Sequence, residues 1–366
     1  MQLRRRLSGF ALAIVVALVA AACGTASTAG GGDQRGLTKL RLGLSNLAPG
    51  PEHASLTIPQ ALDYWKEMGL DVEYVLLAGG AATAQALDAG QIDIAMANGL
   101  VYVRAGAQGA DLQAIYTYVT KDFTQPFQAI AGHGVATPAD LAGKRVGVQS
   151  LESGAIPVLR AMAARAGLSD SDFEVVPIGS GAEAIEAARR GAVDVLAMWD
   201  VAYREMRDAG VPLQPINDEF FDSLGFSLVY GARGDYIAEN PKVIDAFGRG
   251  LAMGSEFVST NPEAAVRLHW EVFPDSRPTG LSEEEALAKA VDLLELRWQS
   301  AQPVAGKWGY SSPEQVQSAI EVWRRAEARS GDKGIVEPSA VWTDRFVDAF
   351  NEFDRVKVQE QARNYK

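Results

Sequence analysis

The spacing of hydrophobic and polar positions switches repeatedly between two periods along the first half of the chain. TKLRLGLSN (38–46) and LDVEYVLL (70–77) have the alternation of β-strands, whereas LTIPQALDYWKEMG (56–69) has the spacing of a helix that stops at a glycine. Residues 79–90 predict a further helix, and residues 92–98, 110–120 and 126–134 predict further strands. This order predicts an α/β unit with a sheet covered by helices.

A second unit of the same kind begins at Thr137, a predicted N-cap with Pro138 at the first helical position of a short helix that stops at Gly143. Beyond it, the pattern predicts strands at 144–150 and 172–178 and helices at 150–167 and 180–191. The second unit therefore repeats the order of the first.

A short stretch of sequence also recurs between the two units. GGAATAQALDAGQIDI (79–94) corresponds to SGAEAIEAARRGAVDV (180–195), with Gly80 on Gly181 and Asp93 on Asp194 at one constant offset. The glycines supply the start and the stop of a helix. The shared aspartate contacts backbone amides at the strand start or, as the alternative, touches a ligand. Two copies are too few for a solenoid and suit two facing lobes.

The last third of the chain is predicted to be mainly helical. A strand at 226–234 is expected to return to the first unit, and helical spacing continues through residues 241–353. The tryptophans in this part lie at helical spacing and are interpreted as packing residues: Trp270, Trp298, Trp323 and Trp342. The tail at 357–366 is expected to be exposed.

The N-terminus has the features of an export signal. Arg4, Arg5 and Arg6 precede an uncharged apolar run that is short for a membrane span and ends in small residues before Cys23. AAAC resembles the lipobox of bacterial lipoproteins, which implies acylation of Cys23 and a lipid anchor. Ala20 stands where leucine is commoner, so ordinary signal cleavage stays open as the alternative. The predicted segments are a signal peptide at 1–22 and a lipidated flexible linker at 23–37.

Composition and charge exclude several classes of function. The formal net charge is −12, and loss of the signal peptide would make it three units more negative, so nucleic acid is not expected as a partner. Cys23 is the single cysteine, which excludes an intramolecular disulfide. The sequence has no HExxH, GxSxG or P-loop motif and no Cys/His cluster for zinc, so neither a metal nor a cofactor is expected.

The stretches 61–98 and 140–200 resemble the bacterial binding-protein family that serves uptake of sulfonates, nitrate, taurine and thiamine-pyrimidine precursors. The resemblance implies a two-lobed α/β periplasmic-binding-protein fold (type II), each lobe a mixed sheet flanked by helices, with extra C-terminal helices on lobe one. Lobe one would comprise 38–132 and the chain's return at 227–366, and lobe two 133–226. It also implies a monomer that is located outside the cytoplasm. This protein would give its ligand to a permease that works with ATPase subunits.

Ligand residues are expected where strands end and helices begin, because open α/β sheets bind ligands there and free helix amides favour negative charge. The resemblance places the tryptophan and acid at 199–200 at the cleft, although core packing is the alternative for the tryptophan. The alternatives are that the glycines only permit turns, that the serines only cap a helix and that the tyrosine only packs in the core. The candidate ligand residues are Asn46, Gly79, Gly80, Ala81, Asn98, Tyr118, Ser150, Ser153, Trp199 and Asp200.

The charges near these segments favour a particular ligand class. The acids are Glu52, Glu152, Asp200 and Glu219, against Arg104, Lys121 and a charged His53. A simple oxyanion site needs more cations, although amides alone can hold one. The sequence therefore favours a neutral or nitrogen-containing ring, such as a thiamine-precursor pyrimidine, over nitrate, taurine or an alkyl sulfonate.

Two other classes of function compete with a binding protein. The fungal pyrimidine synthases resemble the same family and imply a pyridoxal phosphate lysine, a sacrificial histidine and a cysteine-rich iron motif. This chain has three histidines in all, and its one cysteine lies in the leader. It therefore lacks the residues for that chemistry, and an enzyme is disfavoured. A surface lipoprotein that binds only proteins would not need two ligand-facing glycine loops.

Overall fold

The computed structural model describes residues 36–121, 127–216, 218–219, 221, 224–327 and 336–365. The predicted signal peptide at 1–22, Cys23 and the linker as far as residue 35 lie outside the described residues. Within the described residues, every helix is too short or too polar to span a membrane.

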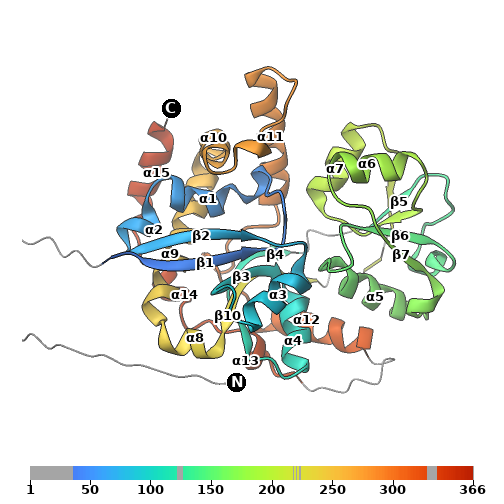
Figure 1. The fold of residues 1–366 in the computed structure, drawn as a ribbon, viewed down its shortest axis with the longest axis horizontal. Coiled ribbons are helices and arrows are strands. Elements are labelled where there is room, and N and C mark those ends of the chain that lie inside the picture. Colours follow the sequence, from blue (N-terminus) through green and yellow to red (C-terminus); the bar gives the residue numbers. More distant parts are fainter. Residues whose placement is uncertain are drawn as a thin grey trace, which may run out of the picture. The chain divides into compact units, whose positions relative to one another are not determined.

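The first sheet has five strands in the order β2-β1-β3-β10-β4 (Figure 1). The strand β1 pairs in parallel with β2 and with the central strand β3, and β10 runs antiparallel to β3 and β4. Its strands are β1 (Thr38–Leu44), β2 (Leu70–Leu76), β3 (Ile94–Asn98), β4 (Leu112–Lys121) and β10 (Gly225–Arg233). The strand β10 thus returns to the first sheet from the far part of the chain, where the sequence pattern placed it.

The second sheet repeats this arrangement in the order β7-β6-β8-β5-β9. The strand β6 pairs in parallel with β7 and β8, while β5 runs antiparallel to β8 and β9. Its strands are β5 (Gln128–Ile130), β6 (Arg145–Val148), β7 (Glu174–Pro177), β8 (Val195–Leu196) and β9 (Leu213–Pro215). The sequence analysis assigned 126–134 to the first lobe, but β5 belongs to the second sheet, so the chain crosses before residue 128 rather than at 132.

Helices flank both sheets (Figure 1). The first sheet and its crossings are accompanied by α1 (Ala54–Ala61), α2 (Tyr64–Glu67), α3 (Gly80–Asp88), α4 (Gly99–Ala107) and α8 (Gly234–Glu239). The second has α5 (Ala155–Arg165), α6 (Ala182–Arg189) and α7 (Asp200–Asp208). The C-terminal helices are α9 (Pro241–Thr260), α10 (Pro262–Val272), α11 (Glu283–Trp298), α12 (Pro313–Glu327), α13 (Pro338–Val341), α14 (Val347–Phe350) and α15 (Arg355–Asn364). Short 3-10 turns include η1 (Pro51–His53), η2 (Pro138–Leu141), η3 (Asp170–Asp172) and η5 (Pro274–Ser276).

Three local predictions differ from the structure. The helix expected over 56–69 is two helices, because Asp63 adopts a left-handed conformation with φ 56° between α1 and α2. The helix α4 was not predicted. The tail at 357–366 is not simply exposed, since α15 packs on α9 and buries Val358 and Ala362.

The repeated aspartates hold equivalent positions in the two sheets. Asp93 accepts hydrogen bonds from the Arg41 backbone N–H (2.7 Å), Nε (3.1 Å) and Nη2 (2.7 Å). Asp194 does the same for Arg145, at 2.9, 3.2 and 3.1 Å. Each arginine also donates to the carbonyl of the glycine that follows the helix before the aspartate. This glycine is Gly90 after α3 and Gly191 after α6. The prediction that the aspartates contact backbone amides is confirmed, and these contacts hold Arg41 in the middle of β1 and Arg145 at the start of β6.

One hydrophobic cluster continues from the first sheet into the second. It includes Val101 of α4, Val146 of β6, Leu159 of α5 and Trp323 of α12. The helix α12 packs on α5 of the second lobe as well as on α4 and β10 of the first. Trp270, Trp323 and Trp342 are buried, as predicted for packing residues.

Candidate functional site

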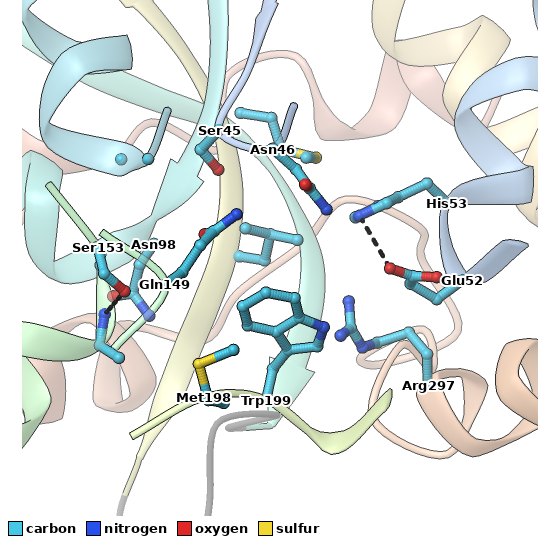
Figure 2. A pocket seen from close by; sticks show the side chains of 16 residues that line it. Ser45, Asn46, Glu52, His53, Asn98, Gln149, Ser153, Met198, Trp199 and Arg297 are labelled. Carbon is cyan, nitrogen blue, oxygen red and sulfur yellow. Dashed lines mark hydrogen bonds and ion pairs between the residues drawn. The ribbon is translucent and has the colours of Figure 1, made fainter. Parts of the chain in front are cut away.

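A pocket lies where the carboxyl ends of the central strands of both sheets meet (Figure 2). Its empty volume is about 610 Å³, part of which is open to solvent. Both sheets contribute lining residues: Ser45, Asn46, Glu52, His53, Gly79, Gly80, Met96, Asn98, Gln149, Ser153, Gly154, Ala155, Met198, Trp199, Leu228 and Arg297. The prediction of a site at strand ends between the lobes agrees with the position of this pocket.

Four helices begin at the pocket. Their N-caps are Gly79 for α3, Asn98 for α4, Gly154 for α5 and Trp199 for α7. Each helix has at least nine residues, so each contributes the partial positive charge of a helix N-terminus. Asn98 caps its own helix by accepting from the Leu100 backbone N–H at 2.9 Å. The backbone therefore makes this region favourable for electron-rich ligand atoms.

Six of the ten predicted ligand residues line the pocket: Asn46, Gly79, Gly80, Asn98, Ser153 and Trp199. Figure 2 shows the Trp199 indole in the middle of the pocket, with the side-chain amides of Asn46 and Gln149 on one side and the Arg297 guanidinium beside it. Met96, Met198 and Leu228 add apolar surface. The pocket thus combines one aromatic ring, an apolar wall and several amide and hydroxyl groups.

Close contact between the lobes explains two glycines at the pocket. Gly79 has φ +119°, and a Cβ there would lie 2.6 Å from the Glu152 carbonyl oxygen. A Cβ on Gly154 would lie 2.9 Å from the Asn98 Cβ. Both positions therefore need glycine because backbone from one lobe lies against the other.

Two further predicted residues make contacts between the lobes instead of lining the pocket. The Ser150 hydroxyl donates to the Ala78 carbonyl at 2.8 Å, and the Ala81 backbone N–H donates to the Glu152 carbonyl at 3.1 Å. These bonds join the loop before α3 to the loop before α5. Ala81 and Ser150 therefore hold the two glycine-containing loops together.

Tyr118 and Asp200 complete the predicted set, and neither lines the pocket. The Tyr118 ring is buried near Trp298 and Tyr230, and its hydroxyl donates to the Glu52 carbonyl. This is the packing role that the sequence left open for it. Asp200 is the first residue of α7, and its carboxylate faces Arg297 rather than the pocket. The geometry does not support direct ligand contact by either side chain.

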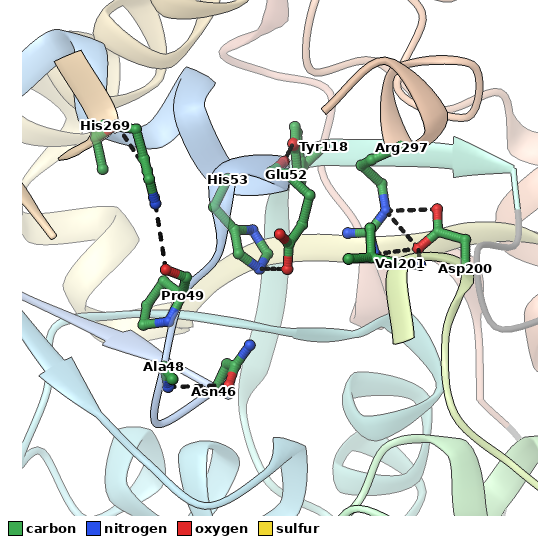
Figure 3. Close-up of polar contacts among 11 residues, drawn as sticks. Asn46, Ala48, Pro49, Glu52, His53, Tyr118, Asp200, Val201, His269 and Arg297 are labelled. Carbon is green, nitrogen blue, oxygen red and sulfur yellow. Dashed lines mark hydrogen bonds and ion pairs between the residues drawn. The ribbon is translucent and has the colours of Figure 1, made fainter. Parts of the chain in front are cut away.

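Arg297 is the pocket residue that the sequence analysis missed. It belongs to α11, a helix interpreted only as packing, and its side chain is 1% exposed. Its Nε and Nη2 donate to the Asp200 Oδ2 and Oδ1 at 2.9 and 2.6 Å (Figure 3). Burial lowers the pKa of Arg297, but the charge and hydrogen bonds of Asp200 raise it above the ordinary value. The site therefore holds a charged arginine whose charge is balanced from the other lobe.

The other charged candidates do not add a cation to the pocket. Arg104 and Lys121 are exposed outside it, and Arg104 lines a separate groove with Glu152. Glu219 is exposed as well. Among the acids named from the sequence, only Glu52 lines the pocket.

Glu52 and His53 form a buried acid-imidazole pair in the pocket wall. The Glu52 Oε1 lies 3.6 Å from His53 Nε2, and both side chains are at least 94% buried. Burial raises the pKa of Glu52 to about 7, against the opposing charge of Arg297. Burial and Arg297 hold the pKa of His53 well below its ordinary value, so this imidazole is neutral. The expectation that His53 carries a charge is therefore wrong.

The pair Glu52–His53 also has polar atoms that could form hydrogen bonds with a ligand. Within the described residues, Glu52 Oε2 and His53 Nδ1 are buried and have no hydrogen-bond partner. Leaving such atoms without a partner costs free energy. A polar ligand that reaches this end of the pocket would recover part of that cost.

A C-terminal helix also holds the loop that carries Asn46. His269 of α10 is completely buried, with Nε2 3.2 Å from the Pro49 carbonyl and Nδ1 3.2 Å from the Thr57 hydroxyl (Figure 3). Burial lowers the pKa of His269 to about 4. Because a carbonyl only accepts, the neutral ring carries its proton on Nε2. The packing of α10 therefore positions the pocket loop at residues 46–50.

The part of the chain that the structure describes contains no group of three or more His, Cys, Asp or Glu side chains arranged to hold a metal ion. The polar atoms of the pocket are amides, hydroxyls, one acid-imidazole pair and one paired arginine.

Comparison with known proteins bears on the same region of the chain. A family model described as NMT1/THI5 like matches residues 50–265. A protein of Brucella abortus, named only as a candidate binding protein, is 26% identical over 207 residues, which are 56% of this chain and 62% of that protein. The chain thus spans less than two thirds of that relative. A Saccharomyces cerevisiae 4-amino-5-hydroxymethyl-2-methylpyrimidine phosphate synthase is 21% identical over 246 residues, covering 64% of this chain and 70% of the synthase.

Among solved structures, the alkanesulfonate-binding protein SsuA of Xanthomonas axonopodis bound to MOPS aligns with a TM-score of 0.60. The identity is 19%, and the alignment covers 84% of this chain and 99% of that one. The fold is accordingly the two-lobed α/β fold of periplasmic binding proteins, as predicted. Since the family model covers more than half of the sequence, the chain belongs to the NMT1/THI5-like family.

Proposed function

We propose that this protein is an extracytoplasmic substrate-binding lipoprotein of an ABC importer. It captures one small molecule between its two lobes and delivers it to a permease that works with ATPase subunits. The supporting observation is the pocket itself, which takes its lining from the strand ends of both sheets and from four helix starts. A pocket built by both lobes links binding to the relative position of the lobes.

We infer that the ligand is a neutral or nitrogen-containing ring of the size of a pyrimidine. The Trp199 indole offers a flat face to such a ring, and Met96, Met198 and Leu228 offer apolar contact. The polar edge of the ring would meet the amides of Asn46 and Gln149 and the pair Glu52–His53. The charges support this class, because Arg297 is balanced by Asp200 and His53 is neutral.

A second candidate ligand class is a small oxyanion such as nitrate, taurine or an alkyl sulfonate. Four helix N-termini face the pocket and favour negative charge. Against this class stand two carboxyl groups, those of Glu52 and Asp200, beside one guanidinium.

A thermal-shift screen of the purified protein tests both ligand classes together. A compound that binds only the native state raises the unfolding midpoint as its concentration exceeds Kd. We expect a concentration-dependent rise with aminopyrimidines and none with methanesulfonate, taurine or nitrate. The opposite pattern would assign the oxyanion class.

The same ligand then tests for an enzyme. The hit compound is incubated with stoichiometric protein and recovered after denaturation. A binding protein returns it unchanged by mass spectrometry, whereas a synthase or hydrolase of the same fold returns a product.

A further inference from the structure

The pair Arg297–Asp200 spans the two lobes at the edge of the pocket. Arg297 comes from α11, which packs on η1 and α10 of the first lobe and on α7 of the second, whereas Asp200 opens α7 itself. Two N–H groups of the guanidinium point at the two carboxylate oxygens (Figure 3). This parallel geometry is the same one with which arginine binds a free carboxylate or sulfonate.

Asp200 is held firmly in that position. Its Oδ1 also accepts from the Val201 backbone N–H at 2.8 Å, and its side chain is 15% exposed. Being at the start of α7, it lies in the favourable field of a helix N-terminus. The carboxylate therefore occupies the place where a ligand anion would gain from both the guanidinium and the helix.

The buried guanidinium needs one anion, and the protein supplies it. Arg297 is 1% exposed and lines the pocket, so water compensates its charge poorly. Without a carboxylate at position 200, the buried guanidinium would keep Glu52, whose pKa burial raises to about 7, as its acidic neighbour, and it would lie among four helix N-termini. Such a pocket attracts small oxyanions from solution.

We propose that Asp200 determines the charge specificity of the pocket: it occupies the guanidinium of Arg297 as an internal counter-ion and thereby excludes small oxyanions. The proposal rests on the proposed function of ligand binding in this pocket and adds the residue that rejects one ligand class. Asp200 thus acts on specificity without touching the ligand.

A second ion pair on the same two helices provides a matched control. Arg204 of α7 and Asp292 of α11 lie 2.8 Å apart, but their side chains are 40% and 44% exposed. Neither lines the pocket around Trp199. Asp292→Asn therefore changes the same charge between the same helices without exposing the pocket to a buried cation.

The test measures binding of methanesulfonate by calorimetry, in a buffer free of sulfonate, sulfate and phosphate, to the full-length wild type and to Asp200→Asn. We expect Asp200→Asn to bind methanesulfonate at least tenfold more tightly than the wild type. We also expect its unfolding midpoint to be lower without the anion and to recover when the anion is added. Asp292→Asn should resemble the wild type in both measurements, and Asp200→Asn/Arg297→Met should lose the gain.

Several outcomes would overturn the proposal. These are a folded Asp200→Asn that binds methanesulfonate no better than the wild type, a wild type that binds it as tightly as the variant, or an equal gain in Asp292→Asn. If Asp200→Asn does not fold with or without the anion, Asp200→Ser takes its place, because serine leaves room for an anion where the carboxylate stood. A folded Asp200→Ser without the gain also overturns the proposal.

The test of Asp200 does not depend on whether the proposed ring ligand is correct. A wild type that binds none of the screened rings would contradict the ring assignment. It would leave the comparison of Asp200→Asn with Asp292→Asn intact, because methanesulfonate reports only on the charge around Arg297.

Discussion

The carboxyl group of Glu52 and the imidazole of His53 lie 3.6 Å apart in the pocket wall, and both are buried. Burial shifts the pKa of the two groups in opposite directions, up to about 7 for Glu52 and well below the ordinary value for His53. At neutral pH the pair therefore consists of a neutral imidazole beside a carboxyl group close to its own titration point. The charged and ionisable groups that act on Glu52 and His53 include Arg297, Asp200, Glu205, Tyr118 and His269.

The raised pKa of Glu52 predicts a pH-dependent stability difference between the wild type and Glu52→Gln. In the unfolded chain this carboxyl titrates near 4.5, so between pH 4.5 and 7 the folded state binds more protons. The free energy of unfolding of the wild type therefore falls as pH rises through this window. Glu52→Gln has no carboxyl group at this position and therefore does not lose this free energy. The free energy of unfolding of the variant, relative to that of the wild type, should rise between pH 4.5 and 7 by on the order of 3 kcal/mol.

Urea unfolding at pH 4.5, 5.5, 6.5 and 7.5 measures this difference. His53 and His269 have lowered pKa values in the folded protein. Each histidine therefore lowers the free energy of unfolding of the protein as pH falls below about 6.5. Both histidines are present in the two proteins, so in a first approximation their contribution cancels in the difference. Parallel stability curves for wild type and Glu52→Gln would contradict the raised pKa.

Trp199→Ala should weaken binding of the ring ligand at least tenfold with little loss of stability. The side chain is only partly buried and lies in the middle of the pocket, so its removal takes away ligand contact more than core packing. A tenfold loss corresponds to about 1.4 kcal/mol, within the range of aromatic stacking. Titration calorimetry with the hit from the screen gives the affinity. Trp199→Phe, which keeps a ring, should lose less, and an unchanged affinity in Trp199→Ala would remove this residue from the site.

His269→Phe should loosen the pocket loop. The variant keeps a buried ring but loses the hydrogen bond to the Pro49 carbonyl, and we expect a loss of about 2 kcal/mol of stability. Hydrogen exchange followed by mass spectrometry should show faster exchange in the peptide that covers residues 46–53. Thr57→Val removes the contact at Nδ1 and the hydroxyl's bond to the Ala54 carbonyl but keeps the bond between His269 and Pro49, and it is the control. Equal exchange in His269→Phe and wild type would show that α10 does not hold the loop.

The two repeated aspartates should contribute similarly to stability. Asp93→Ala and Asp194→Ala each leave a part-buried arginine backbone N–H without its acceptor, and each should cost about 2 kcal/mol. Urea midpoints measure both, with Asp88→Ala on the exposed end of α3 as the control. If Asp93→Ala matches the control, the contacts with Arg41 do not stabilise the fold.

Cys23→Ser tests the proposed anchor. Acylation would require the thiol, so growth with an alkyne-tagged fatty acid should label the wild type and leave the variant unlabelled. The variant should also move from the membrane fraction to the soluble fraction. Labelling of neither protein would favour ordinary signal cleavage, the alternative that Ala20 leaves open.

Sequence patterns predicted the backbone of the site better than its electrostatics. Strand spacing located the ends of β1, β3 and β6, because the position of a strand end follows from local spacing. This spacing and the family resemblance together placed Asn46, Asn98 and Trp199 at the pocket. Arg297 could not be found in this way. Helical spacing in α11 indicates a buried face but not which distant residue balances a buried charge, and its partner Asp200 lies 97 positions away.

Tyr118 and Asp200 show the same limit. Both lie near strand ends, yet one ring turns into the core and one carboxylate turns toward α11. Side-chain direction at these positions depends on helices from the C-terminal third, whose placement no local pattern specifies. The sequence does carry one signal for Arg297, which falls at the same helical spacing as the apolar positions Ala290 and Leu293.

The packing of α12 on α5 and α4 has a consequence for how the protein unfolds. Since one hydrophobic cluster contains Val101, Val146, Leu159 and Trp323, neither lobe can lose its packing without exposing apolar surface of the other. The two lobes therefore form a single cooperative unit, and heating should melt both sheets in one calorimetric transition whose van't Hoff and calorimetric enthalpies agree.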